Sequence, residues 1–150
     1  MLVGEAPGPS VVRLRRPGEA LTGAAGRRLA ALAGVPLVTY LRRTERVNLL
    51  DAYPGERWPS AEARDRARSL LPRLAGRTTL LAGRRVAAAF GVDAPWYEWV
   101  ELDGGRVAVL PHPSGRSRYW NDPANRDAAA EFLRAALNRA IPIDRLAAVG

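Results

Sequence analysis

The chain has 150 residues but contains no cysteine, no lysine and only one histidine, His112. The lack of cysteine excludes a disulfide, an iron-sulfur cluster, a thiolate zinc site and a cysteine nucleophile, and a single histidine excludes a multi-histidine metal site. No apolar run approaches the roughly 18 residues that span a bilayer, and residues 1–5 lack the basic flank of a signal peptide. We therefore expect a soluble, cytoplasmic protein without a metal.

Positive charge is abundant and unevenly distributed. All 23 basic residues are arginine, and they outnumber the 15 acidic residues to give a net charge of +8. The choice of arginine over lysine has an alternative explanation in the codon usage of a genome rich in G and C. Codon usage does not explain the net charge. An excess of this kind is typical of nucleic-acid-binding proteins. Residues 1–50 carry only three acids against eight arginines, namely Arg13, Arg15, Arg16, Arg27, Arg28, Arg42, Arg43 and Arg46.

Short apolar runs alternate with helical periodicity along the chain, which favours an α/β layer fold in one domain over residues 1–150. Continuous apolar runs predict buried strands at Leu2-Val3 and over residues 47–50 and 78–82. Helices are predicted over residues 23–33, 37–43, 60–74 and 84–90, with Gly34 and Gly76 as stops and Ser60 as an N-cap.

The last third predicts a hairpin and a long helix. Residues 96–100 and 106–110 flank Asp103-Gly104-Gly105, a sequence typical of a tight turn between paired strands. Asp122 and Pro123 suit the N-cap and first position of a helix that extends to Ala140 and is closed by Pro142.

Two loops rich in polar residues and proline directly follow predicted strands. Residues 4–8 place Glu5 between glycines, and residues 112–118 place His112 beside serine and arginine. Loops at the carboxyl ends of parallel strands meet at the edge of the sheet where ligands bind, so we expect these two to face one another. Taken singly, each has a plain structural explanation: a turn with a solvated glutamate, and a hydrogen-bonded histidine.

Both loops also resemble the signature motifs of a known family. Gly4-Glu5-Ala6-Pro7-Gly8 is similar to the first motif of the uracil-DNA glycosylase superfamily, closest to its bacterial and archaeal family 4, and His112-Pro113-Ser114 is similar to the second. Residues 18–26 resemble the stretch in which a turn leads into a Gly-x-Ala-Gly helix start. The resemblance covers roughly residues 1 to 140. It implies a three-layer α/β fold with a central, mainly parallel four-stranded sheet flanked by helices.

The resemblance implies a role for each matching residue. Such enzymes flip a nucleotide out of DNA and hydrolyse its N-glycosidic bond without a cofactor. His112 would stabilise the anion of the leaving base, and Glu5 would orient water and oppose the cationic sugar. Gly4, Ala6, Pro7, Gly8, Leu21 and Asn48 would form the base pocket, in which the Asn48 amide reads the base edge, although an asparagine at this place could equally cap a strand.

The same resemblance places the DNA contacts. Ser114, Gly8, Pro9 and Ser10 would hold the flanking phosphates, with added charge from Arg116 and Arg118. Tyr119 and Trp120 would either wedge into the base stack or pack beneath the last helix. The expected partner is single- or double-stranded DNA, bound by a monomer with no membrane and no metal involved.

Three departures separate the chain from family 4. It lacks the four cysteines that hold an iron-sulfur cluster there, and Leu21 stands where the family has an aromatic residue that stacks on uracil. It also has no second histidine for covalent attachment to DNA. The expected activity is therefore excision of uracil or of a modified pyrimidine. Two alternatives stay open: a catalytically inactive nucleic-acid-binding module of the same fold, and a glycosidase that acts on free nucleotides.

Overall fold

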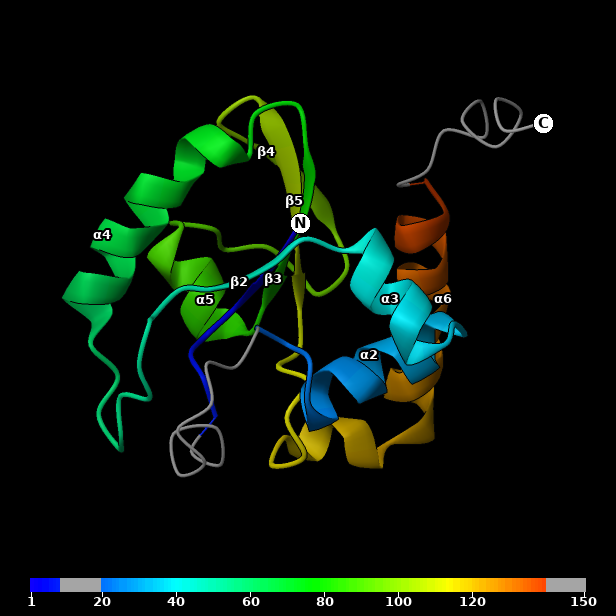
Figure 1. Ribbon diagram of the computed structural model, residues 1–150. Coiled ribbons are helices and arrows are strands. Elements are labelled where there is room, and N and C mark those ends of the chain that lie inside the picture. The colour runs from blue at the N-terminus through cyan, green and yellow to red at the C-terminus, as the bar shows by residue number, and fades with distance from the viewer. Residues whose placement is uncertain (9–19, 140–150) are drawn as a thin grey trace.

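The computed structural model describes residues 1–8 and 20–139 and shows a sheet between two layers of helices (Figure 1). The strands are β1 (Leu2–Gly4), β2 (Arg46–Asn48), β3 (Thr78–Ala82), β4 (Trp99–Leu102) and β5 (Gly105–Leu110), in the spatial order β2-β1-β3-β5-β4. Four of them are parallel, and β4 pairs antiparallel with β5. The predicted three-layer α/β fold is confirmed.

The predicted number of strands is wrong, because the sheet has five strands rather than four. The fifth is the edge strand β4, the first arm of the predicted hairpin. Asp103 and Gly104 form its turn with φ of 51° and 75°, the left-handed geometry that a two-residue hairpin loop requires. The arm begins at Trp99 rather than Trp96, which makes only an isolated bridge to Val109.

Helices cover both faces of the sheet. In Figure 1, α4 (Ser60–Leu70) and α5 (Arg84–Ala89) lie on one side, and α2 (Ala24–Ala33), α3 (Leu37–Arg43) and α6 (Pro123–Arg139) lie on the other. Short 3₁₀ turns follow α4 at Leu71–Arg73 and precede α6 at Arg118–Asn121. No helix within residues 1–8 and 20–139 is long and apolar enough to cross a membrane.

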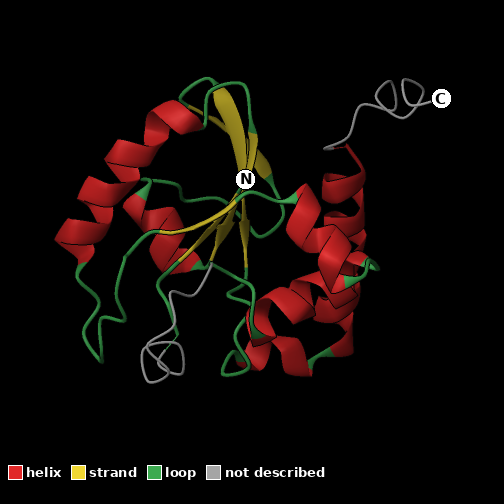
Figure 2. Cartoon of the chain, viewed as in Figure 1, coloured by secondary structure: helices red, strands yellow, loops and turns green. Residues whose placement is uncertain are grey.

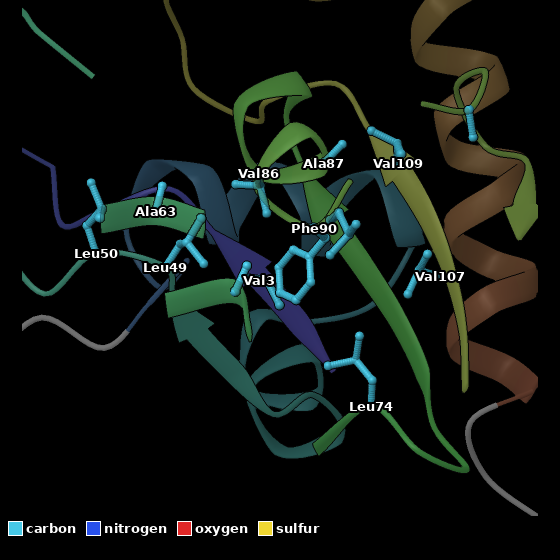
Figure 3. Packing of buried hydrophobic residues seen from close by; sticks show 13 residues of the cluster. Val3, Leu49, Leu50, Ala63, Leu74, Val86, Ala87, Phe90, Val107 and Val109 are labelled. Carbon is cyan, nitrogen blue, oxygen red and sulfur yellow. The ribbon is translucent and has the colours of Figure 1, made fainter. Parts of the chain in front are cut away.

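Alternation along the strands divides the core into two layers. Val3, Leu81 and Val107 pack with Phe90 and the helices α4 and α5, and Figure 3 shows the Phe90 ring beside Val3. The neighbouring residues Leu2, Leu80 and Ala108 face the opposite way, toward α2, α3 and α6. Successive side chains of a strand point to opposite faces, so strands buried on both sides read as the continuous apolar runs seen in the sequence.

The helix ends follow the sequence signals in part. Gly34 ends α2 in the left-handed conformation, with φ of 69°, and Asp122 Oδ1 accepts a hydrogen bond of 2.9 Å from the Ala124 amide at the start of α6. The prediction for Ser60 is wrong, because Pro59 is the N-cap of α4 and Ser60 is the first helical residue. Ala140 and Pro142 lie outside the described residues.

Two further boundaries differ from the prediction. The strand β2 ends at Asn48, before Leu49 and Leu50. The amides of these two leucines instead donate to the carbonyl oxygens of Gly4 and Glu5, at 2.8 and 2.9 Å. The helix α4 ends at Leu70 rather than Leu74, since Pro72 follows and the chain continues as a 3₁₀ turn.

Candidate active site

The two predicted loops meet at one edge of the sheet. Gly4 is in register with Asn48, and Ala82 is in register with Leu110, so β1, β2, β3 and β5 all end at the same level. The loops that follow them gather at this edge (Figure 2). The Nε2 atom of His112 lies 4.0 Å from Oε2 of Glu5, with side chains 32% and 23% exposed. The carboxylate and the imidazole are thus neighbours that solvent can still reach.

Glu5 and His112 come from strands that are not adjacent, because β3 lies between β1 and β5. The first residue after β3 is Gly83, with φ of 110°. A Cβ atom there would lie 3.2 Å from Oε1 of Glu5 and 3.4 Å from the His112 ring. The pair therefore meets over a position that has no side chain and whose backbone conformation is essentially restricted to glycine.

Hydrogen bonds determine the tautomer of His112. The backbone amide of Ser114 donates to Nδ1 at 3.2 Å, so Nδ1 is the unprotonated nitrogen of the neutral ring and Nε2 carries the hydrogen. The loop is held by Trp120 Nε1, which donates to the His112 carbonyl at 2.8 Å, and by Arg28, which donates to the Pro113 carbonyl at 2.8 Å. The Nε2–H group is thereby available as a hydrogen-bond donor.

Burial and charge affect the protonation of this ring. Burial lowers the pKa of His112; the nearby Glu5 carboxylate raises it, and the Arg85 guanidinium lowers it further, with a net lowering. Arg85 Nη1 lies 4.0 Å from the same Glu5 oxygen that faces His112. The carboxylate therefore lies between a permanent cation and an imidazole that is neutral at neutral pH.

Two cavities meet at this pair. The α2 cavity, of about 290 Å³, is lined on its own side by Leu21, residues 22–25 at the start of α2, and Asn48. The Arg85 groove, of about 830 Å³, is lined on its own side by Arg85, Arg116, Ser117 and residues 53–56. The residues that line both are Glu5, Ala6, Pro7, Gly8, His112, Ser114 and Gly115. The Glu5–His112 pair thus lines both a small chamber and a wider groove.

The backbone fixes the floor of the α2 cavity. Leu21 has a positive φ of 54°, which is uncommon for residues other than glycine, and its carbonyl accepts a hydrogen bond of 3.2 Å from the Tyr40 hydroxyl. The helix α2 approaches so closely that a Cβ on Gly26 would lie 2.0 Å from this carbonyl oxygen. A Cβ on Gly4 would lie 2.9 Å from the Asn48 amide oxygen, so the amide lies directly against the backbone.

Most of the predicted site residues are brought together. Gly4 is buried and lines neither cavity, although its Cβ position lies against Asn48 and Leu21, which line the α2 cavity. Arg116 is exposed on the wall of the Arg85 groove. Arg118 is exposed but lines neither cavity. Tyr119 lies behind the loop, where its hydroxyl is 3.1 Å from that of Tyr97 and its ring packs edge-on against Trp96 and Trp120. Ser10 and Pro9 lie outside the described residues. The functional roles of these residues stay predictions.

Sequence reasoning missed four contributors: Gly83, Arg85, Tyr53 and the start of α2. The signal for the first two was present, because they follow the predicted strand over residues 78–82. The Gly-Ala-Ala-Gly start of α2 was visible as well. Tyr53 is 40% exposed on the groove wall, and no local pattern marks it. Among the described residues, no group of three or more acidic or histidine side chains could hold a metal ion.

Comparison with known protein families identifies the superfamily of the chain. The family model of the uracil DNA glycosylase superfamily matches residues 1–137. The chain belongs to this superfamily, which indicates a glycosylase-type hydrolase that binds DNA and acts in DNA repair. A comparison with curated proteins gave no match.

The charges around His112 give a prediction in solution. We expect an imidazole pKa below the usual value of about 6.5, measured by NMR titration of the one histidine in the sequence. Replacing Glu5→Gln removes the anion that favours the imidazolium and should lower the pKa further, whereas Arg85→Gln should raise it. Arg134→Gln, on the exposed surface of α6, serves as the control and should leave the pKa where it is. A rise in Glu5→Gln would contradict this assignment.

Gly83→Ala tests the need for an empty position beneath the pair. We expect a loss of stability of about 2 kcal/mol from the backbone conformation, together with a change in the His112 titration, because the new methyl group displaces Glu5 and the ring. Gly91→Ala is the matched control: Gly91 also has a positive φ, of 70°, but nothing lies within 4 Å of its Cβ position. It should lose stability with an unaltered titration. If His112 titrates identically in both variants, the proposed close approach of Glu5 and His112 over Gly83 is refuted.

Proposed function

We propose that the protein is a monofunctional DNA glycosylase that flips uracil or a modified pyrimidine out of DNA and hydrolyses its N-glycosidic bond to leave an abasic site. The observation that carries this is the Glu5–His112 pair at the meeting of two cavities. In this assignment the base enters the α2 cavity while the strand stays in the Arg85 groove. A chamber of about 290 Å³ is near the lower end of the range typical of small-molecule pockets.

The chemistry divides between the two side chains. Cleavage sends the bonding electron pair of the N-glycosidic bond to the base, which leaves as an anion, and the sugar becomes oxocarbenium-like. The Nε2–H group of neutral His112 donates to the base oxygen on which this charge develops. The Glu5 carboxylate opposes the positive sugar and orients the water that attacks C1′. The proton of that water passes to Glu5 or to solvent, and the base anion is protonated after it leaves.

Other residues support base recognition and single-step chemistry. The Asn48 side chain carries both a donor and an acceptor, which suits the edge of a pyrimidine. A glycosylase that also cleaves the strand through a Schiff base commonly uses a lysine amine, and the sequence contains no lysine. We also propose that the protein acts as a monomer in the cytoplasm.

Base excision is tested directly on oligonucleotides. Single- and double-stranded DNA carrying uracil, a hydroxymethyl pyrimidine or a glucosylated pyrimidine is incubated with the protein and then treated with alkali. We expect strand scission on at least one substrate. Glu5→Gln and His112→Ala should each lower the single-turnover rate about 10²- to 10⁴-fold, with DNA affinity nearly unchanged.

The same assay separates the alternatives. Binding without scission on any substrate would indicate an inactive nucleic-acid-binding module. Cleavage of free nucleotides with no cleavage of DNA would indicate a nucleotide glycosidase. Full activity in both variants would refute the proposed roles of Glu5 and His112.

Leu21 should control the size of the base that is accepted. Its side chain lines the α2 cavity and packs against Gly4, whose Cβ position lies 3.3 Å from Leu21 Cγ. Leu21→Phe reduces the free volume and should lower the ratio of kcat/KM for a 5-substituted pyrimidine over uracil by about tenfold, the scale at which apolar pockets discriminate. Leu21→Ala should shift the ratio in the opposite direction. An equal response to both bases would place Leu21 outside the base pocket.

A further inference from the structure

A third hollow lies beside the Arg85 groove and has no role in the chemistry described above. It has a volume of about 280 Å³ and lies between the start of α4 and the exposed face of α5. We call it the Trp58 hollow, and its lining residues are Trp58, Ser60, Arg64, Arg84, Arg85, Ala88 and Ala89.

Arg85 connects this hollow to the reaction centre. Its side chain lines both the hollow and the Arg85 groove. The guanidinium carbon lies 5.6 Å from the centroid of the Trp58 ring, while Nη1 is 4.0 Å from Oε2 of Glu5. A guanidinium held over an aromatic face keeps its charge and its N–H donors. The hollow therefore adjoins, at the Arg85 side chain, the groove in which the DNA strand is proposed to lie.

The charge that lines the hollow is positive. Three arginines line it, and no acidic residue does. Arg84 is fixed by its donation to the Ala94 carbonyl and by its stacking 3.8 Å from the Trp96 centroid. Arg64 differs from the other arginines of α4 in the described part of the chain: Arg66 pairs with Asp51 and Arg68 with Asp65, whereas Arg64 has no acidic partner there.

These features fit an anionic oxygen cluster. Guanidinium groups present several N–H donors in a plane and bind phosphate in a bidentate manner. A serine hydroxyl is a further donor to phosphate, and Ser60 is exposed at the same hollow. A carboxylate would disfavour this ligand, and none lines the hollow.

We propose that the Trp58 hollow binds a backbone phosphate of the DNA strand that carries the target nucleotide, through Arg64, Arg85 and Ser60. This phosphate belongs to a neighbouring nucleotide of the same strand, on the side of α4, and not to the nucleotide whose base enters the α2 cavity. Trp58 acts as a positioning residue that holds the Arg85 guanidinium between this phosphate and Glu5. This assignment rests on the proposed function for the identity of the strand.

Binding measurements test the subsite without requiring excision. A set of single-stranded oligonucleotides, each with one linkage replaced by a neutral methylphosphonate, is bound to the wild-type protein and to Arg64→Gln. One linkage should weaken wild-type binding by about tenfold, the lower end of the range for a hydrogen bond to a charged group. The same replacement should have a clearly smaller effect in Arg64→Gln, because one of the two arginines proposed to bind that phosphate is gone. Additive effects at every linkage would overturn the proposal.

Salt dependence gives a second readout. Loss of one phosphate contact should reduce the slope of log K against log salt by about 0.7 for a single strand, so Arg64→Gln should show a shallower slope. Arg64→Lys keeps the charge and should restore the slope. Arg134→Gln removes the same charge from α6, on the opposite side of the sheet, and should behave as the wild type at every linkage. An equal loss of slope in Arg64→Gln and Arg134→Gln would indicate general electrostatics and refute the subsite.

The outcome separates this proposal from the proposed function. If the protein excises a base but the effects of Arg64→Gln and of each methylphosphonate simply add, the phosphate subsite is refuted and the glycosylase assignment stands. Linkage-specific coupling in a protein that excises no base would establish the phosphate subsite in a binding module. Thermal unfolding of each variant confirms folding, and little change is expected because Arg64 is exposed.

Discussion

The site depends on a steric constraint at the end of the central strand β3. The strand β3 lies between β1 and β5, so side chains at the ends of β1 and β5 are not on adjacent strands. Gly83 lets Glu5 and His112 approach each other above β3, since a Cβ would lie 3.2 Å from the carboxylate and 3.4 Å from the ring. The loops on either side are then held by backbone contacts, with the Leu49 and Leu50 amides bonded to Gly4 and Glu5. A rigid framework of this kind preorganises charged groups without requiring them to move during reaction.

Electrostatics adds a second level of organisation. His112 is a donor through Nε2 because the Ser114 amide occupies Nδ1, and burial lowers its pKa so that the ring is neutral. Arg85 supplies a permanent positive charge at the same distance from Glu5 as the imidazole. The carboxylate thus has one charged and one neutral neighbour. The negative charge of Glu5 raises the pKa of His112, and the positive charge of Arg85 opposes this effect.

Much of the fold could be predicted from local patterns, because strands buried on both faces and helices ended by glycine leave clear signals. Leu80 and Leu81 belong to an apolar run whose strand was predicted, and Gly34 and Asp122 mark helix ends as expected. The loops of Glu5 and His112 were predicted to meet because parallel strands end at one edge. Gly83 and Arg85 follow a predicted strand, which marks their position at the edge of the sheet but not their role. That role depends on which strand lies between the two loops, and no local pattern specifies the spatial order β2-β1-β3-β5-β4. The sequence pattern indicated the edge strand β4 as the first arm of a hairpin, and only the four-stranded sheet implied by the family resemblance left it out. The prediction that Ser60 is the N-cap of α4 is wrong because Pro59 occupies that position.

The two cavities that share Glu5 and His112 have a consequence for the order of events after bond cleavage. If the base lies in the α2 cavity and the strand in the Arg85 groove, the two products contact different residues beyond the shared walls: Leu21 and Asn48 on one side, and Arg85 and Arg116 on the other. Release of the base therefore breaks none of the contacts that Arg85 and Arg116 make with the strand. An enzyme built in this way could retain the abasic strand after the free base has diffused away, and so shield a reactive sugar until another protein takes it over.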